Sequence, residues 1–197
     1  MPGRHEITRA DILPPAQYAA ERQARRGTLI ALKRHRRIEV GPHAILLFEN
    51  YDTMWSQIHE MLFIEQGGDA QIDDELAAYN PLIPKGRELV ATMMLEIDDP
   101  GRRARVLARL GGIETMISLE FADDTVFGQP TDDGVARSTS EGRTSSVHFL
   151  HFAFSPGQIE KFRQPGTQII AAIRHPDYEH LAVMPEATRA ALARDFD

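Results

Sequence analysis

The chain of 197 residues has 22 Lys and Arg against 29 Asp and Glu, a formal net charge of −7 at pH 7, and no cysteine. The lack of cysteine excludes disulfides, thiolate catalysis and Cys-ligated zinc or iron–sulfur clusters, so a bound Fe, Mn or Zn ion would need carboxylate and His ligands. The acidic balance argues against nucleic-acid binding. No apolar run approaches the roughly 20 residues that span a bilayer, and the N-terminus lacks the apolar centre of a signal peptide. A cytoplasmic protein with no membrane partner is therefore expected.

The N-terminal half alternates helical patterns with one strongly apolar strand pattern. Pro14-Pro15 opens a long helical pattern rich in Ala, Arg, Gln and Leu, in which Gly27 costs about 1 kcal/mol relative to Ala. Pairs of Gly and Pro residues then end successive elements. The predicted elements are a long basic helix over 16–37, a short extended piece up to Gly41-Pro42, a strand over 43–49, a helix over 52–66 and a shorter helix over 69–79.

The C-terminal half has strand patterns of alternating apolar side chains, separated by short helices. Asp99-Pro100 and Ser155-Pro156 mark two helix starts, because each places Pro at the first helical position behind an N-cap residue. Residues 122–145 hold many Gly, Asp, Ser and Thr residues and are predicted to form a long loop or flap. The predicted elements are strands over 88–97, 113–121, 147–154 and 167–174, and helices over 101–110, 155–162 and 185–196.

These elements lack the regular βαβ period and the Gly-rich turn of a nucleotide-binding fold. They predict a single α+β domain over residues 1–197, with a mixed or mostly antiparallel sheet of about five strands and helices packed on one side. The segment from His175 to His180 contains metal-capable side chains but is interpreted as a surface turn.

Polar side chains gather where the strand over 43–49 meets the helix over 52–66. Asp52 or Thr53 is expected to cap that helix. Glu65 projects into the middle of the helix's apolar arc, where an unpaired carboxylate would cost several kcal/mol, so it either reaches water as the helix ends or occupies an interior polar site. The pattern suggests a carboxylate-rich pocket. The candidate ligand-binding residues are Glu49, Asn50, Gln57, Glu60 and Glu65, with Asn80 and Glu96 as possible wall residues.

Known metal motifs are incomplete in this sequence. His59-Glu60 begins an HExxH pattern, but Phe63 stands where the second histidine would be. His148 and His151 are predicted on opposite faces of one strand, so they are not expected to share an ion. A single metal held by carboxylates of the joint and a distant histidine stays open as an alternative.

The segment from Glu21 to Arg37 contains seven Arg or Lys residues and one Glu. One interpretation is a solvated basic helix that pairs with acidic patches of the same chain. The other is a docking face for an anionic partner, such as an acidic protein. The docking candidates are Arg22, Arg25, Arg26, Lys33, Arg34 and Arg37.

The sequence resembles a bacterial family, the domain of unknown function 3501. The resemblance is carried in order by ALKRHRRIEVGPHAILLFEN, DTMWSQIHEML, DDELAAYNPLIP, ELVATMMLEI, LGGIE, VHFLHF and HPDYEHLAVMPEATRAAL. Genes of this family often stand beside those for rubrerythrin and an iron–sulfur oxidoreductase. The resemblance implies an accessory role in a bacterial redox or peroxide-stress system, and it transfers no catalytic residue.

Three hypotheses follow. The first is a cytoplasmic accessory protein that binds a redox partner protein. The alternative is a small metal-dependent enzyme or sensor with a carboxylate-rich pocket around the strand–helix joint at 46–65. The third is a structural subunit whose polar residues form a satisfied network in the core. Neither a reaction nor an oligomeric state is specified by these patterns.

Overall fold

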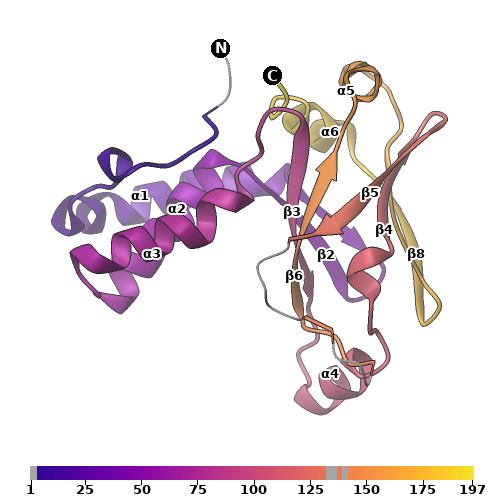
Figure 1. The fold of residues 1–197 in the computed structure, drawn as a ribbon, viewed down its shortest axis with the longest axis horizontal. Helices are drawn as coiled ribbons and strands as arrows, with labels where there is room; N and C mark the ends of the chain where they lie inside the picture. Colours follow the sequence, from indigo (N-terminus) through magenta and orange to yellow (C-terminus); the bar gives the residue numbers. More distant parts are fainter. Residues whose placement is uncertain (1–3, 132–136, 139–141) are drawn as a thin grey trace.

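The computed structural model describes residues 4–131, 137–138 and 142–197, and it forms an antiparallel barrel from which a helical arm projects (Figure 1). In these residues eight strands make one sheet in the order β1-β2-β3-β6-β5-β4-β7-β8, with every neighbouring pair antiparallel. The sheet is nearly closed, because its edges β1 and β8 lie beside each other. The strands are β1 (Arg37–Val40), β2 (Ala44–Glu49), β3 (Glu88–Leu95), β4 (Ile117–Phe121), β5 (Asp124–Pro130), β6 (Val147–Ala153), β7 (Ile170–His175) and β8 (Tyr178–Val183).

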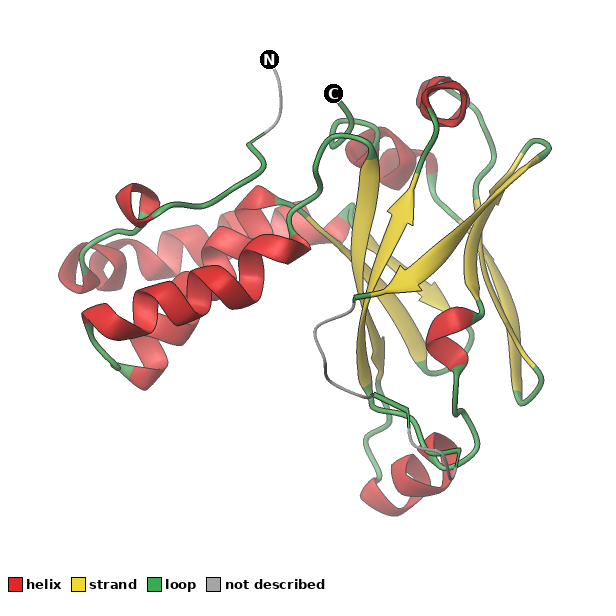
Figure 2. Ribbon diagram, in the orientation of Figure 1, coloured by secondary structure: helices red, strands yellow, loops and turns green. Residues whose placement is uncertain are grey.

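Helices make up the arm and lie at both ends of the barrel (Figure 2). The arm contains α1 (Pro15–Arg34), α2 (Tyr51–Glu65) and α3 (Asp69–Tyr79). At one end of the barrel lies α4 (Pro100–Leu107), and at the other lie α5 (Pro156–Arg163) and α6 (Glu186–Leu192). Single 3₁₀ turns are η1 (Arg9–Asp11), η2 (Asn80–Leu82) and η3 (Ile113–Thr115).

Apolar side chains that alternate along the strands fill the interior of the barrel. Leu46 of β2 pairs in register with Met93 of β3, and Phe48 of β2 contacts Phe152 of β6. All four side chains are fully buried. Burial of one such side chain contributes about 1.5–3 kcal/mol relative to exposure, so this core holds the barrel together.

A second apolar cluster joins the arm to the outside of the barrel. Val90 of β3 and Phe149 of β6 project from the outer face of the sheet and pack with Tyr51, Met54 and Ile58 of α2. The period of two along a strand places these residues opposite the barrel core. The first turns of α2 therefore anchor the arm, while the rest of the arm extends away from the sheet (Figure 1).

The predicted five-stranded sheet with helices on one side is wrong: the sheet has eight strands, is nearly closed, and has helices at its ends as well as in the arm. The segments that sequence patterns did not assign as strands are β1, β5 and β8. In β1 the alternate side chains Arg37 and Glu39 are exposed and polar. In β8 the exposed face mixes Glu179 with Leu181 and Val183, and in β5 Gly128 and Pro130 resemble loop composition. A long apolar face is absent from each, so burial patterning does not reveal them.

Several predicted segments differ in their bounds from the observed elements, among them the basic helix and the long loop. The long basic helix ends at Arg34, and Arg37 begins β1. Residues 124–130 of the predicted loop or flap form β5, and residues 132–136 and 139–141 of that prediction lie outside the described residues. Over the part of the chain that the structure describes, no helix combines the length and apolarity needed to cross a membrane.

Candidate functional site

The joint between β2 and α2 holds Glu49 and Asn50 in separate roles. Glu49 is buried, and its Oε1 accepts a hydrogen bond from Thr92 Oγ1 at 2.7 Å. Asn50 is the N-cap of α2: its side chain accepts from the Thr53 backbone N–H at 3.0 Å, while the Asn50 N–H donates to Thr53 Oγ1 at 2.9 Å. The N-cap is therefore Asn50 and not Asp52 or Thr53 as expected, with Thr53 as the third helical residue of a reciprocal capping box that engages the side-chain oxygen of Asn50.

Gln57 and Glu60 lie on one flank of α2, but their side chains contact different helices: Glu60 contacts α1 and Gln57 contacts α3. Glu60 accepts two hydrogen bonds from the Arg22 guanidinium, each 2.8 Å long, and one from Tyr18 Oη at 2.7 Å. The Arg22 contact holds the pKa of Glu60 below its usual range. Gln57 instead points toward Tyr79, with its amide nitrogen 3.5 Å from the hydroxyl.

The remaining carboxylate and amide candidates lie apart from these. Glu65 is exposed at the end of α2, where its carboxylate accepts from Gln71 at 2.9 Å. Asn80 fastens the N-terminal segment through two hydrogen bonds with the Ile7 backbone, at 2.8 and 2.9 Å. Glu96 is exposed just past β3. The seven candidates therefore do not converge on one cavity, and in the described ranges no group of three or more His, Asp or Glu side chains is arranged to hold a metal ion.

The basic candidates divide into two groups. One group forms ion pairs with carboxylates of this chain and so serves the packing of the fold. The other belongs to α1 and is exposed, apart from the half-buried Lys33. The first group is Arg22, Arg25 and Arg37; the second is Arg26, Lys33 and Arg34.

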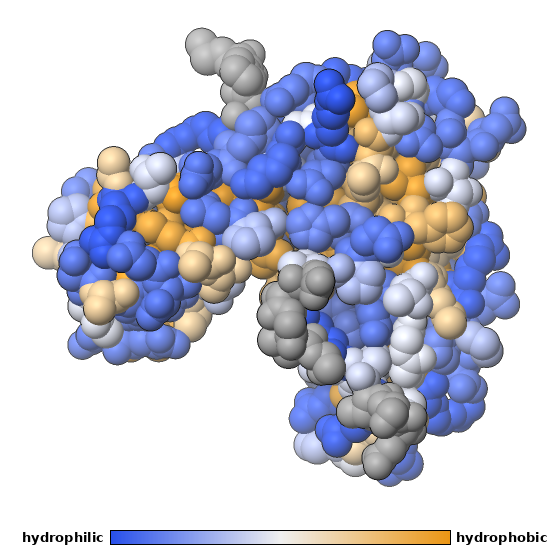
Figure 3. All heavy atoms as spheres, viewed as in Figure 1, coloured by the Kyte–Doolittle hydropathy of each residue, from blue (hydrophilic) through white to orange (hydrophobic). Residues whose placement is uncertain are grey.

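A groove of about 670 Å³ lies on the arm. Its walls come from four segments: Ile12 and Leu13 precede α1, Leu62 and Phe63 belong to α2, and Ile72 belongs to α3, with Tyr18 of α1 completing the lining. Figure 3 shows apolar side chains exposed on the arm and bordered by hydrophilic ones. The size and apolar walls are those of a typical binding site in proteins.

The floor of the groove consists of aromatic rings and offers no free reactive group among the described residues. The His59 ring lies 4.9 Å from the Tyr18 ring and 3.7 Å from the Trp55 ring, centroid to centroid. His59 Nδ1 donates to the Trp55 carbonyl at 2.7 Å and Nε2 accepts from the Leu13 N–H at 3.0 Å, while burial lowers the pKa of His59. Burial likewise raises the pKa of Tyr18. Both ring nitrogens of His59 are engaged, so the groove offers ring faces and apolar surface rather than a reactive group.

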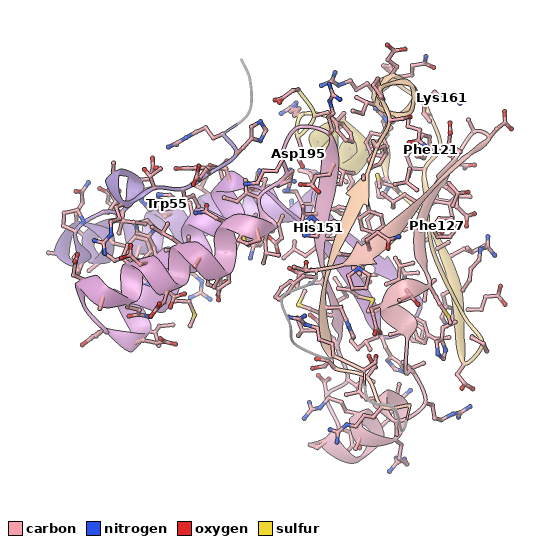
Figure 4. All side chains as sticks on the ribbon, viewed as in Figure 1. Trp55, Phe121, Phe127, His151, Lys161 and Asp195 are labelled. Carbon is pink, nitrogen blue, oxygen red and sulfur yellow. The ribbon has the colours of Figure 1, made fainter. Side chains whose placement is uncertain are left out.

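Sequence patterns did not reveal this groove because the N-terminal segment forms one of its walls. That segment has no helical or strand period of its own. It is fixed to the arm by distant contacts, among them the bond from Trp55 Nε1 to the Asp11 carbonyl at 2.9 Å and the Asn80 contacts described above. Trp55, labelled in Figure 4, lies on α2 beneath this segment. The paired prolines before α1 were the one local signal that the chain turns here.

Comparison with known proteins identifies relatives of unknown function. The family model described as protein of unknown function (DUF3501) matches residues 6–196, which confirms the predicted resemblance. A crystal structure of a protein of unknown function from Burkholderia pseudomallei K96243 is 36% identical, with a TM-score of 0.89, covering 97% of this chain and 99% of that chain. No curated protein matches.

Proposed function

The chain belongs to the DUF3501 family, and we propose that it is a binding protein that docks an acidic redox partner through its helical arm. The observation that carries the proposal is the presence, on one projecting arm, of an apolar groove and an exposed basic helix face. An apolar anchor site supplies binding energy, and complementary charge supplies orientation and association rate.

The basic face is an exposed part of α1. Arg26, Ile30 and Arg34 follow one another at intervals of four residues, so their side chains lie on one face of the helix. Ile30 is 61% exposed between the two guanidinium groups. A cationic stripe with an apolar centre complements a partner surface in which carboxylates surround an apolar side chain.

The groove supplies the second half of the docking surface. Its apolar walls suit one or two apolar side chains of the partner, which would be withdrawn from water on binding at about 25 cal/mol per Å² of buried apolar surface. At its polar rim, the Arg9 guanidinium is already paired with Asp69 and Asp73 of the same chain. The groove is therefore expected to contribute affinity, and the α1 face to contribute selectivity for acidic proteins.

The class of partner comes from the family resemblance. Rubrerythrin and an iron–sulfur oxidoreductase are the expected gene neighbours, which makes these two proteins the candidates to test. In this proposal the protein itself carries no redox centre. It would bind and position a partner that does.

The charge test uses the purified protein with each candidate partner in a calorimetric titration at low and at physiological salt. Reversal of both exposed charges, Arg26→Glu with Arg34→Glu, is expected to weaken binding roughly tenfold at low salt and to reduce its salt dependence. The matched control is Arg102→Glu with Arg105→Glu on α4, which changes the charge equally at another end of the molecule. Equal loss in both double variants, or binding of neither candidate partner, would overturn the proposal.

The groove test fills the cavity without changing charge. Ile72→Trp places an indole ring in the groove, whereas Ile64→Trp places the same ring on an exposed site outside the groove lining. Binding is expected to weaken in the first variant and to be unchanged in the second. A loss of binding only with Ile64→Trp would place the anchor elsewhere on the arm.

A further inference from the structure

One outer face of the barrel carries exposed apolar side chains. It is formed by β5, β4, β7 and β8, which are neighbours in the sheet, and Figure 1 shows β4, β5 and β8 on the side of the barrel away from the arm. Phe127 of β5, labelled in Figure 4, is 58% exposed, and Leu181 and Val183 of β8 are 56% and 59% exposed. Exposed apolar side chains that gather on one face mark a site of association.

The strand register aligns Phe127 and Leu181 in one row across this face. Ser118 of β4 pairs with Phe127 on one side and with Ala172 of β7 on the other. Ala172 pairs in turn with Leu181. Residues paired in register point to the same side of a sheet. Ser118 and Ala172 therefore point outward, yet they are only 2% and 0% exposed, so another side chain covers the middle of the row.

The covering group is the ion pair between Arg174 of β7 and Glu120 of β4. Arg174 Nε and Nη2 donate to the two carboxylate oxygens of Glu120, each at 3.0 Å, and Ser118 Oγ donates to Glu120 Oε1 at 3.2 Å. Arg174 Nη1 lies 3.6 Å from a Glu179 oxygen. Carboxylates of the same chain thus occupy the edge of the guanidinium. The Arg174 side chain is still 50% exposed, which leaves the flat face of the guanidinium for a partner.

Phe127 supplies the complementary group. Over the described ranges it has no aromatic ring or cation of its own chain as a neighbour. A guanidinium within about 6 Å of a ring centroid is attracted to the face of the ring, and the attraction grows as water is excluded. The same face of the barrel therefore carries both members of a cation–π contact, each without the other.

The strand order makes this contact reciprocal between two copies. β5 and β7 lie on either side of β4, each about 4.8 Å from it. When two copies face each other with a twofold axis along β4, β5 of each copy lies over β7 of the other. Each Phe127 ring then lies over the Arg174 guanidinium of the other copy. Ser118 is small and lies on the axis, so the two sheets can approach closely.

We propose that this face joins two copies of the chain in a twofold dimer, in which the Phe127 ring of each copy stacks on the Arg174 guanidinium of the other. A face that carries both members of the contact is complementary to itself, as an isologous interface requires. Glu120 neutralises Arg174 within each copy, so the two cations do not oppose association. The face is about 20 Å across, at the low end of specific interfaces, and the dimer is therefore weak. Both arms remain free, because they project from the opposite side of the barrel (Figure 1).

The test measures self-association of the full chain by sedimentation velocity, at concentrations from roughly 1 to 300 µM, the range in which a weak dimer forms. Phe127→Trp keeps a ring with a stronger attraction for cations and is expected to bind at least as tightly as the wild type. Phe127→Leu keeps apolar surface without a ring and is expected to weaken the dimer about threefold, and Phe127→Ala about tenfold. The matched control is Ile64→Ala on the arm, which removes a side chain that is 65% exposed and should leave association unchanged.

A second variant tests the other member of the contact. Arg174→Lys keeps the charge that Glu120 requires but removes the planar guanidinium, and it is expected to weaken the dimer as Phe127→Ala does. Circular dichroism checks that each variant stays folded. A monomer at every concentration, or equal association of the wild type, Phe127→Leu and Arg174→Lys, would overturn the proposal. A dimer that dissociates as salt is raised would indicate pairing of the basic arm with an acidic surface, and would also overturn the assignment to this face.

Discussion

The hydroxyl of Tyr178 donates a hydrogen bond to the Val40 carbonyl at 2.8 Å and so connects the two edge strands of the barrel. The same oxygen accepts hydrogen bonds from the backbone N–H groups of His43 and Ala44, each at 2.9 Å. One side chain at the start of β8 thereby satisfies three backbone groups at the β1–β2 turn. Burial raises the pKa of Tyr178, which keeps the donating proton in place at neutral pH.

Removal of this hydroxyl should loosen the closure of the barrel. In Tyr178→Phe the N–H of Ala44 loses its partner while remaining buried, so we expect a loss of about 2–3 kcal/mol in the free energy of unfolding. The matched control is Tyr79→Phe, because the Tyr79 hydroxyl has only a long 3.5 Å contact, to Gln57. Urea denaturation of both variants measures the difference, and equal small losses would show that Tyr178 does not hold the edges together.

Substitution by Ala should have opposite effects on the stability of the protein at two of its glycines. Gly41 has φ +72°, and a Cβ there would lie 2.4 Å from His180 Cδ2 and 2.9 Å from the Tyr178 hydroxyl oxygen, so Gly41→Ala should destabilise the protein by more than about 2 kcal/mol. Gly27 lies within α1 with open space around it, so Gly27→Ala should stabilise the protein by about 0.5–1 kcal/mol. Thermal unfolding of the pair checks both signs. Stabilisation by Gly41→Ala would contradict the close approach of β8.

The strands that sequence patterns predict are those with a long apolar face. In β3, for example, Leu89, Ala91 and Met93 alternate and are all buried. In β5 the decisive residue is Gly128, where a Cβ would lie 3.0 Å from the Phe152 ring. That glycine permits close packing of β5 on β6 and has a negative φ, but composition alone suggests a turn. Closure of the barrel depends on such tertiary contacts, which no local pattern encodes.

The candidate site was predicted less well than the fold, because side-chain direction on a helix depends on its neighbours. The helical wheel places Gln57 and Glu60 on one flank of α2, yet Gln57 contacts Tyr79 of α3 and Glu60 binds Arg22 of α1. Glu65 is exposed, the outcome expected if it reaches water where the helix ends. Glu114 Oε2 and His148 Nδ1 lie 3.9 Å apart although the two residues are 34 positions apart in the chain, and only the fold brings them together.

Breaking the buried ion pair between Arg36 and Asp195 should destabilise the protein far more than breaking an exposed pair. The two side chains are 2% and 8% exposed, and the guanidinium also donates to the Phe48 carbonyl at 2.8 Å and the Glu49 carbonyl at 3.0 Å. Asp195→Ala leaves a buried cation without its counterion, so we expect a loss of about 3–5 kcal/mol.

The control for that pair is Asp177→Ala. Asp177 pairs with Arg109 on the surface, where the two side chains are 41% and 70% exposed, and its loss should cost less than about 1 kcal/mol. Chemical denaturation of the two variants in parallel gives the comparison. Similar losses in both would mean that desolvation cancels the attraction in the buried pair.

The buried histidines should make the protein sensitive to mild acid. Burial lowers the pKa of His59 below its ordinary value near 6.5, so below that pH the unfolded chain binds a proton that the folded chain does not. Stability from His59 is therefore present above about pH 6.5 and falls as the pH decreases toward the folded pKa, with a limiting slope of about 1.4 kcal/mol per pH unit. Burial also lowers the pKa of His148, so His148 contributes a loss of stability in acid of the same sign. We expect His59→Gln to destabilise the protein most near pH 7.5 and progressively less toward pH 5, and the comparison variant is His35→Gln, at an exposed site after α1. Denaturation curves recorded between pH 5 and 8 check this, and parallel profiles for wild type and His59→Gln would show that the groove histidine does not remain neutral in the folded protein.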